Sequence, residues 1–158
     1  MLEIIEILEK LDQVRAETLR CLEGLTQEQL DARPRREDGE EAWSLGEIFM
    51  HLAIDELYVR EMIARPILAG IQPPEGVRFI PPPPEYGTPK ETIRFWFERA
   101  RVGTVHYLEN LPEDVDLTRT HSGGLDPMNG LAWILSYAGH EAFHHHQINK
   151  LISNGHML

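Results

Sequence analysis

The sequence predicts an all-α protein folded as a four-helix bundle, with a long proline-rich crossover between the second and third helices. Apolar residues recur at three- and four-residue spacing over four long segments, which is typical of amphipathic helices. Capping residues, glycines and prolines stand at the ends of these segments, and no segment shows the alternation of a β-strand. Four such helices bury their apolar faces best against one another. We expect residues 1–158 to form a single domain.

The first helix is expected over about residues 2–23. Its buried stripe consists of Ile4, Leu8, Leu11, Thr18 and Leu22. Gly24 follows as a natural helix stop. Thr26 is placed to cap one additional short turn through Gln29, before a polar loop at 33–41.

The second helix has the clearest start in the sequence. Ser44 and Glu47 have the spacing of a capping box, in which each side chain bonds the backbone N–H of the other residue. Apolar residues continue to about Arg65, and Pro66 is expected to prevent the helix from continuing.

A proline-rich segment over residues 66–89 includes the run Pro81–Pro84, which favours an extended, stiff crossover. The third helix is expected to open with a capping box of Thr88 and Glu91, with Pro89 in its first helical position. It should end before Pro112.

The fourth helix is expected to begin near Asp126 and Pro127, with the aspartate as cap and the proline directly after it. Its apolar stripe continues to Asn154 and Gly155, which are typical residues of a helix end.

Composition excludes several classes of function. The net charge of −11 repels phosphate backbones, so nucleic acid is not expected as a partner. No apolar stretch is long enough to span a membrane, and the first residues lack the features of a signal peptide. The single cysteine, Cys21, cannot form an internal disulfide and is read as a small core residue. These observations predict a cytoplasmic protein.

The informative residues among the eight histidines lie near the C-terminus and in the second helix. His140 and His144 are one turn apart and about 40° apart around a helix, so both imidazoles can chelate one ion. His145 and His146 point away from that pair and are read as outward-facing or interface residues. His51 is the best candidate for a third ligand.

Other residues near these histidines have weaker assignments. Asp55 lies one turn after His51 and is expected to orient its ring, although a solvated helix acid fits equally well. Tyr137, one turn before His140, is either a substrate-positioning residue or a core residue. His106, His121 and His156 have no matching spacing and stay unassigned.

Alternative interpretations exist for each part of this pattern. His140 and His144 are also compatible with two polar residues on an amphipathic helix, and His51 with an ordinary core or surface histidine. The stretch from His140 to His144 matches the zinc-protease motif HExxH, with Glu141 as general base. That interpretation is rejected because no third ligand follows downstream and no peptide-binding edge strand is predicted.

Two stretches resemble the DinB/YfiT-like family of metal-dependent proteins. They are WSLGEIFMHL, residues 43–52, and HEAFHHHQI, residues 140–148. The family pattern places a histidine seven residues after the serine of Trp-Ser, and a glutamine three residues after HxxxH. Its matching positions here are Trp43, Ser44, His51, His140, His144 and Gln147.

The resemblance implies a four-helix bundle, often dimeric, in which His51, His140 and His144 bind a divalent ion such as nickel, zinc, iron or manganese. Many members have Arg-Gly between the last ligand and the glutamine, where this chain has His145 and His146. Those positions point away from the metal, so the ligand assignment is unaffected. A partner contact that the family makes there is put in doubt.

By this resemblance we expect a metal-dependent enzyme acting on a small molecule, either a thiol-dependent transferase or a hydrolase. The metal would activate the sulfur of a low-molecular-weight thiol cosubstrate, or a water. No catalytic residue is assigned. Two alternatives stay open: a non-catalytic, metal-stabilised bundle that binds a partner or small ligand, and a metal-free interaction scaffold.

Overall fold

The computed structural model describes residues 2–34, 42–74, 83–121 and 127–153. This part of the chain is all-helical, as predicted; its β-type pairing is one isolated bridge between Thr120 and Asn129. The helices are α1 (Leu2–Glu23), α2 (Gln27–Asp31), α3 (Leu45–Tyr58), the π-helix η1 (Val59–Ala64), α4 (Arg65–Leu68), α5 (Lys90–Glu109) and α6 (Gly130–Ser153). None of them is both long and apolar enough to cross a membrane.

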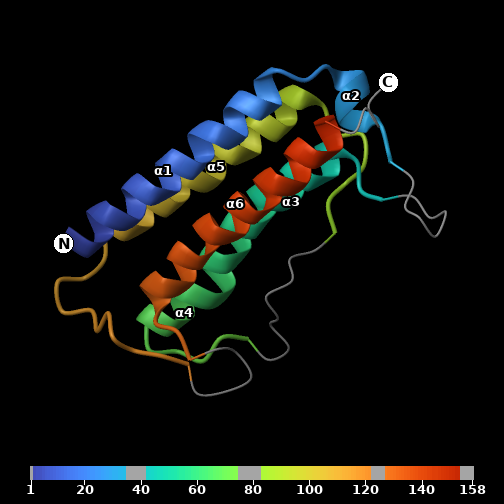
Figure 1. Ribbon diagram of the computed structural model, residues 1–158. Helices are drawn as coiled ribbons and strands as arrows, with labels where there is room; N and C mark the ends of the chain where they lie inside the picture. The colour runs from blue at the N-terminus through green and yellow to red at the C-terminus, as the bar shows by residue number, and fades with distance from the viewer. Residues whose placement is uncertain (1, 35–41, 75–82, 122–126, 154–158) are drawn as a thin grey trace.

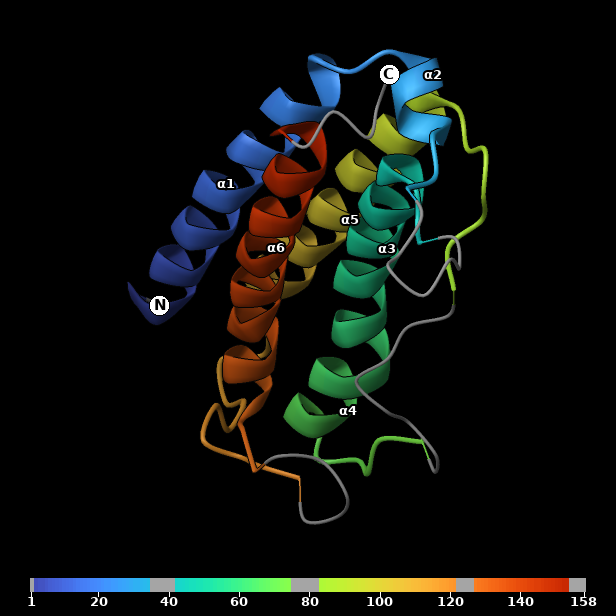
Figure 2. The ribbon, with the colours of Figure 1, turned by 45° about the vertical axis from the view of Figure 1, so that its right-hand side comes forward.

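The long helices α1, α3, α5 and α6 lie side by side (Figure 1). Helix α3 packs against α5 and α6, and α1 packs against α6 and α5. Figure 2 shows that α3 and α5 run in the same direction, from the end that carries α2 toward the end that carries α4. Residues 75–82 of the expected proline-rich crossover lie outside the described residues.

Two predicted helix starts are confirmed. Thr26 and Gln29 form a capping box before α2. Ser44 and Glu47 form the other before α3, where the Ser44 N–H donates to Glu47 at 2.8 Å. Arg33 pairs with the same carboxylate at 2.6 Å. These bonds fix the beginning of the helix that carries His51.

The prediction that Pro66 ends the second helix is wrong. The chain passes from α3 into the π-helix η1, where the Arg65 N–H donates to the carbonyl of Arg60, five residues back. Pro66 then falls in the first turn of α4, directly after the stretch in which the hydrogen bonds span five residues. The helical path therefore continues to Leu68.

The predicted starts of the last two long helices are also wrong. Pro89 is the N-cap of α5, and the Thr88 hydroxyl donates to the Glu85 carbonyl instead of capping the helix. A side chain of α2 replaces the expected cap, because Gln27 Oε1 accepts the N–H of Lys90 at 2.9 Å.

Helix α6 begins at Gly130, later than predicted. Asn129 Oδ1 caps it by accepting the N–H of Ala132 at 2.8 Å. Pro127 precedes the helix, and the expected cap Asp126 lies outside the described residues, as do Asn154 and Gly155 at the predicted helix end.

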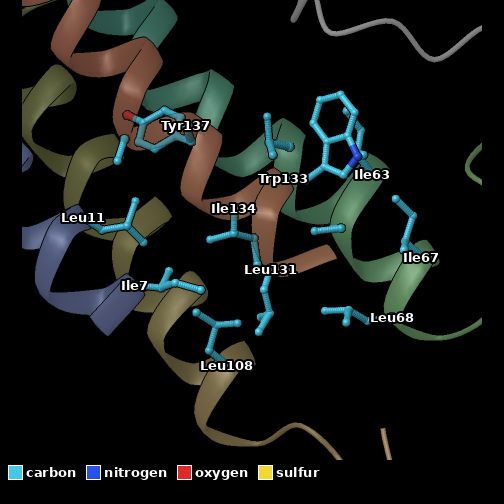
Figure 3. Close-up of a cluster of buried hydrophobic side chains, with 13 residues drawn as sticks. Ile7, Leu11, Ile63, Ile67, Leu68, Leu108, Leu131, Trp133, Ile134 and Tyr137 are labelled. Carbon is cyan, nitrogen blue, oxygen red and sulfur yellow. The ribbon is translucent and has the colours of Figure 1, made fainter. Parts of the chain in front are cut away.

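The apolar core consists of two clusters. One gathers side chains from α1, η1, α4, α5 and α6, several of which Figure 3 shows pointing toward one another. The other lies toward the α2 end and includes Leu22, Phe49, Phe97 and Ile148. Between the clusters, each long helix contributes buried polar side chains, which we call the polar layer: Arg15, Thr18, His51, Asp55, Glu56, Thr104, Glu141 and His144.

Gly103 of α5 lies close to the side chain of Arg60 from η1. Buried Arg60 donates to the Ala100 carbonyl at 2.6 Å and to Thr104 Oγ1 at 3.0 Å. A Cβ atom on Gly103 would lie 2.6 Å from Arg60 Nη1. In contrast, a Cβ atom on Gly139 in α6 would meet nothing within 4 Å.

We therefore expect Gly103→Ala to destabilise the protein by about 1–3 kcal/mol, because the guanidinium must leave its partners. Gly139→Ala is the matched control and should stabilise by about 0.5–1 kcal/mol through helix propensity alone. Chemical denaturation of both variants measures the two free energies. Equal stabilisation by both changes would contradict the placement of Arg60.

Candidate metal site

The structure brings together the three histidines that the sequence selects. His51 comes from α3, and His140 and His144 come from α6. The Nε2 atom of His140 lies 3.4 Å from that of His51 and 3.0 Å from that of His144. One ring nitrogen from each residue lies within 4.8 Å of the other two, so the group can hold a metal ion.

The spacing of these nitrogens fits a shared ion. Imidazole nitrogens about 2.1 Å from one metal, at angles between 90° and 109°, are separated by about 3.0–3.4 Å. The two measured separations fall at the ends of this range. Three ligands of this kind leave further coordination positions open, which is the arrangement of catalytic rather than structural zinc sites.

Contacts at the other ring nitrogen orient two of the imidazoles. His140 Nδ1 bonds Asp55 Oδ2 at 2.6 Å, and His144 Nδ1 bonds Gln147 Oε1 at 2.8 Å. Because these oxygens accept, the bonds assign the proton to Nδ1 and leave the lone pair of Nε2 for a metal. His51 Nδ1 and Asp55 Oδ1 are buried without a hydrogen-bond partner.

The expectation that Asp55 orients His51 is wrong, because Asp55 orients the ring of His140 instead. Asp55 lies on the face of α3 that packs against α6, and its carboxylate reaches His140 across the helix interface. Gln147 was part of the family pattern, but sequence reasoning gave it no role. The signal was available in its position three residues after His144, where side chains on a helix meet.

Burial favours the neutral form of the imidazoles. Desolvation lowers the pKa of His51 to about 4, with further lowering by His140 and His144, although the charge of Asp55 opposes the change. Burial also lowers the pKa of His144, although the hydrogen bond that its Nδ1 donates to Gln147 opposes the change. Neutral imidazole is the form that binds a metal.

Two aromatic rings lie beside the histidines. The Trp43 ring is 5.3 Å from that of His51, and the Phe143 ring is 5.6 Å from that of His144, measured between centroids. Their exposed fractions are 40% and 69%. The site therefore has apolar surface next to it from Trp43, which precedes α3, and from Phe143 of α6.

The glutamate of the HExxH stretch does not face the imidazoles. Glu141 is fully buried, with Oε1 3.0 Å from Arg15 Nε and in contact with the Thr18 hydroxyl on α1. It is therefore not placed to act as the general base of a zinc protease. Tyr137 is a core residue, since its hydroxyl donates to the Leu52 carbonyl at 2.9 Å.

The remaining histidines lie apart from the three. His145 is half-buried and contacts Thr18 of α1, whereas His146 is exposed. His106 is exposed and bonds Asn110. His121 lies in the loop before α6, and His156 lies outside the described residues.

Comparison with known proteins gives the family. The family model described as the DinB superfamily matches residues 10–148, a range that includes all three histidines and Gln147. The chain therefore belongs to the DinB superfamily. No curated protein and no solved structure matches it.

The lowered pKa of His51 predicts a pH-dependent stability of the metal-free protein. Between about pH 4 and pH 6.5 the unfolded chain binds a proton at this position and the folded chain does not, so stability should rise with pH. From pH 5 to pH 7 we expect a gain of about 2 kcal/mol from His51.

Urea denaturation in the presence of a chelator, repeated across this pH range, measures the effect. His51→Gln should flatten the dependence, leaving the smaller part that His144 and His145, whose pKa values burial also lowers, contribute in the same direction. The control His146→Gln changes an exposed histidine and should keep the wild-type slope. An unchanged slope in His51→Gln would show that the ring is not buried in its neutral form.

Proposed function

We propose that this member of the DinB superfamily binds one divalent metal ion through His51, His140 and His144 and is a metal-dependent enzyme acting on a small molecule. The observation that carries the proposal is the 3.0–3.4 Å spacing of Nε2 atoms from two helices. The ion would be nickel, zinc, iron or manganese, since three imidazoles suit several divalent metals.

The proposed chemistry is thiol transfer to a small electrophile, or hydrolysis. A bound divalent ion supplies a Lewis acid that lowers the pKa of a thiol or a water toward neutrality. Asp55 and Gln147 hold the rings of His140 and His144 in the required tautomer. Trp43 and Phe143 would contact the apolar part of a substrate or thiol.

One observation favours a second candidate, a non-catalytic metal-stabilised bundle that binds a partner or small ligand. Both carboxylates next to the histidines are engaged, Asp55 with His140 and Glu141 with Arg15 and Thr18. Neither is free to act as a general base. An enzyme at this site would therefore depend on the metal for activation of its nucleophile.

The proposal also covers the architecture, the oligomeric state and the cellular location of the protein. We infer that α1, α3, α5 and α6 form a four-helix bundle, with the proline-rich segment as its crossover, in one domain over residues 1–158. A homodimer is proposed from the family resemblance, and a cytoplasmic location from the single cysteine, which cannot form an internal disulfide. The exposed Phe143 and His146 on α6 offer surface for such a contact.

The first test combines metal binding and turnover. Metal-free protein titrated with zinc, nickel, manganese or ferrous iron should bind one ion per chain and melt at a higher temperature. Conjugation of a generic electrophile such as chlorodinitrobenzene with a panel of small and aromatic thiols, and hydrolysis of a simple ester, should require the metal. His144→Ala should abolish binding and turnover, whereas the exposed control His146→Ala should retain both.

Three outcomes separate the candidates. Turnover that disappears in His144→Ala supports the enzyme. Full metal occupancy without turnover on any thiol or ester supports the non-catalytic bundle. A melting temperature that no metal changes, together with no bound ion, contradicts both and leaves the scaffold interpretation.

The second test addresses Asp55. Asp55→Asn keeps a hydrogen-bond acceptor for His140 but removes the charge that makes the imidazole a better ligand, so metal affinity should fall by about 10- to 100-fold. Competition with a chromophoric chelator measures this affinity. Asp31→Asn in α2, whose carboxylate bonds Gln27, is the control and should bind like wild type. Equal affinity of Asp55→Asn and wild type would contradict the role.

A further inference from the structure

Arg15 of α1 joins all four long helices at one point. Its guanidinium lies 2.6 Å from Glu56 Oε2 of α3, 3.0 Å from Glu141 Oε1 of α6 and 2.9 Å from the Tyr137 hydroxyl of α6. It also donates to the Phe97 carbonyl of α5 at 3.1 Å. The side chain is 5% exposed, so these contacts replace water almost completely.

Both carboxylates that Arg15 holds stand next to residues of the candidate metal site. Glu56 follows Asp55 in α3, and Glu141 follows His140 in α6. Successive residues on a helix differ by about 100° in direction. When Arg15 fixes the direction of Glu56 and Glu141, it also fixes the direction in which Asp55 and His140 point.

Arg101 of α5 strengthens this arrangement. Its Nε lies 3.0 Å from Glu56 Oε1, and its Nη1 lies 2.6 Å from Asp12 of α1. Burial alone would raise the pKa of Glu56, but the charges of Arg15 and Arg101 lower it, so the carboxylate is ionised. The positive charges of Arg15 and Arg101 are therefore matched by those of Glu56 and Glu141, with one of these residues from each long helix.

Such a buried ion network is not explained by stability alone. Desolvation of buried charges offsets most of their attraction, and apolar side chains of similar size often serve stability better. A rotation that separates paired buried charges is, however, costly, whereas an apolar layer tolerates rotation of one helix against another. The polar layer lies where such a rotation would separate His51 from His140 and His144.

We propose that Arg15 is a positioning residue, which by pairing with Glu56 and Glu141 sets the rotation of α3 and α6 that makes the three histidines converge. Its consequence for metal affinity rests on the proposed function. The role of Arg15 in bringing the rings together does not rest on the proposed function, because the distance between the rings can be measured without metal.

The test uses Arg15→Met, which keeps an unbranched, flexible side chain but removes the guanidinium and its charge, and Arg15→Lys, which keeps the charge and loses the paired geometry. Leu108→Ala is the control, because it removes packing in the apolar cluster on one side of the polar layer. Nuclear Overhauser effects between the ring Hε1 protons of His51 and His140 report convergence in metal-free protein. Zinc affinity and the visible spectrum of the cobalt(II) form report the completed site.

In Arg15→Met we expect the inter-ring effects to disappear, the zinc affinity to fall at least tenfold and the cobalt spectrum to change. Arg15→Lys should lose part of the inter-ring effects and part of the zinc affinity. If Arg15→Met does not fold, the measurements on Arg15→Lys test the inference. Leu108→Ala should lose melting temperature but keep the inter-ring effects and bind zinc within about threefold of wild type.

Inter-ring effects of wild-type strength in both Arg15 variants would overturn the inference, whatever happens to stability. Loss of the same effects in Leu108→Ala would also overturn it, because general loosening would then be sufficient. If the wild-type protein shows the inter-ring effects but binds no zinc, nickel, manganese or ferrous iron, the proposed function fails. The role of Arg15 is then still decided by the ring measurements.

Discussion

Burial of many polar groups in the middle of an apolar core is the constraint on which this structure depends. Each long helix contributes to the polar layer, and water is largely excluded from it. A buried charge without a partner is costly, so each helix must present its polar residue to a partner on another helix. The four helices can meet this requirement only in a narrow range of rotations, and in that range the three imidazoles converge.

The same constraint shapes the chemistry that the site can perform. Neutral imidazoles are favoured by burial, and the neighbouring carboxylates are used in holding the structure. Little acid–base capacity therefore remains beside the histidines within the described residues. In a reaction at this site, a bound cation would stabilise the charge that develops on the reacting atoms. The aromatic rings of Trp43 and Phe143 would contact the substrate without taking part in the reaction.

Sequence reasoning succeeded where the signal lies within one helix. The i, i+4 pair His140 and His144 and the capping box of Ser44 follow from helix geometry alone, and the family pattern supported His51. It failed where the partner comes from another helix. Asp55 was paired with the wrong histidine, the α2 cap of α5 was not foreseen, and Arg15 was given no role. Spacing along the chain does not reveal which helix lies opposite.

The HExxH stretch makes the same point about function. Its glutamate lies about 100° around the helix from the first histidine, so the two side chains face different neighbours. In this protein the histidines face α3, while Glu141 faces α1 and meets Arg15 and Thr18. A carboxylate held in this way positions a helix and is not available to activate water. The packing around the helix, rather than the motif itself, therefore determines which of its residues can do chemistry.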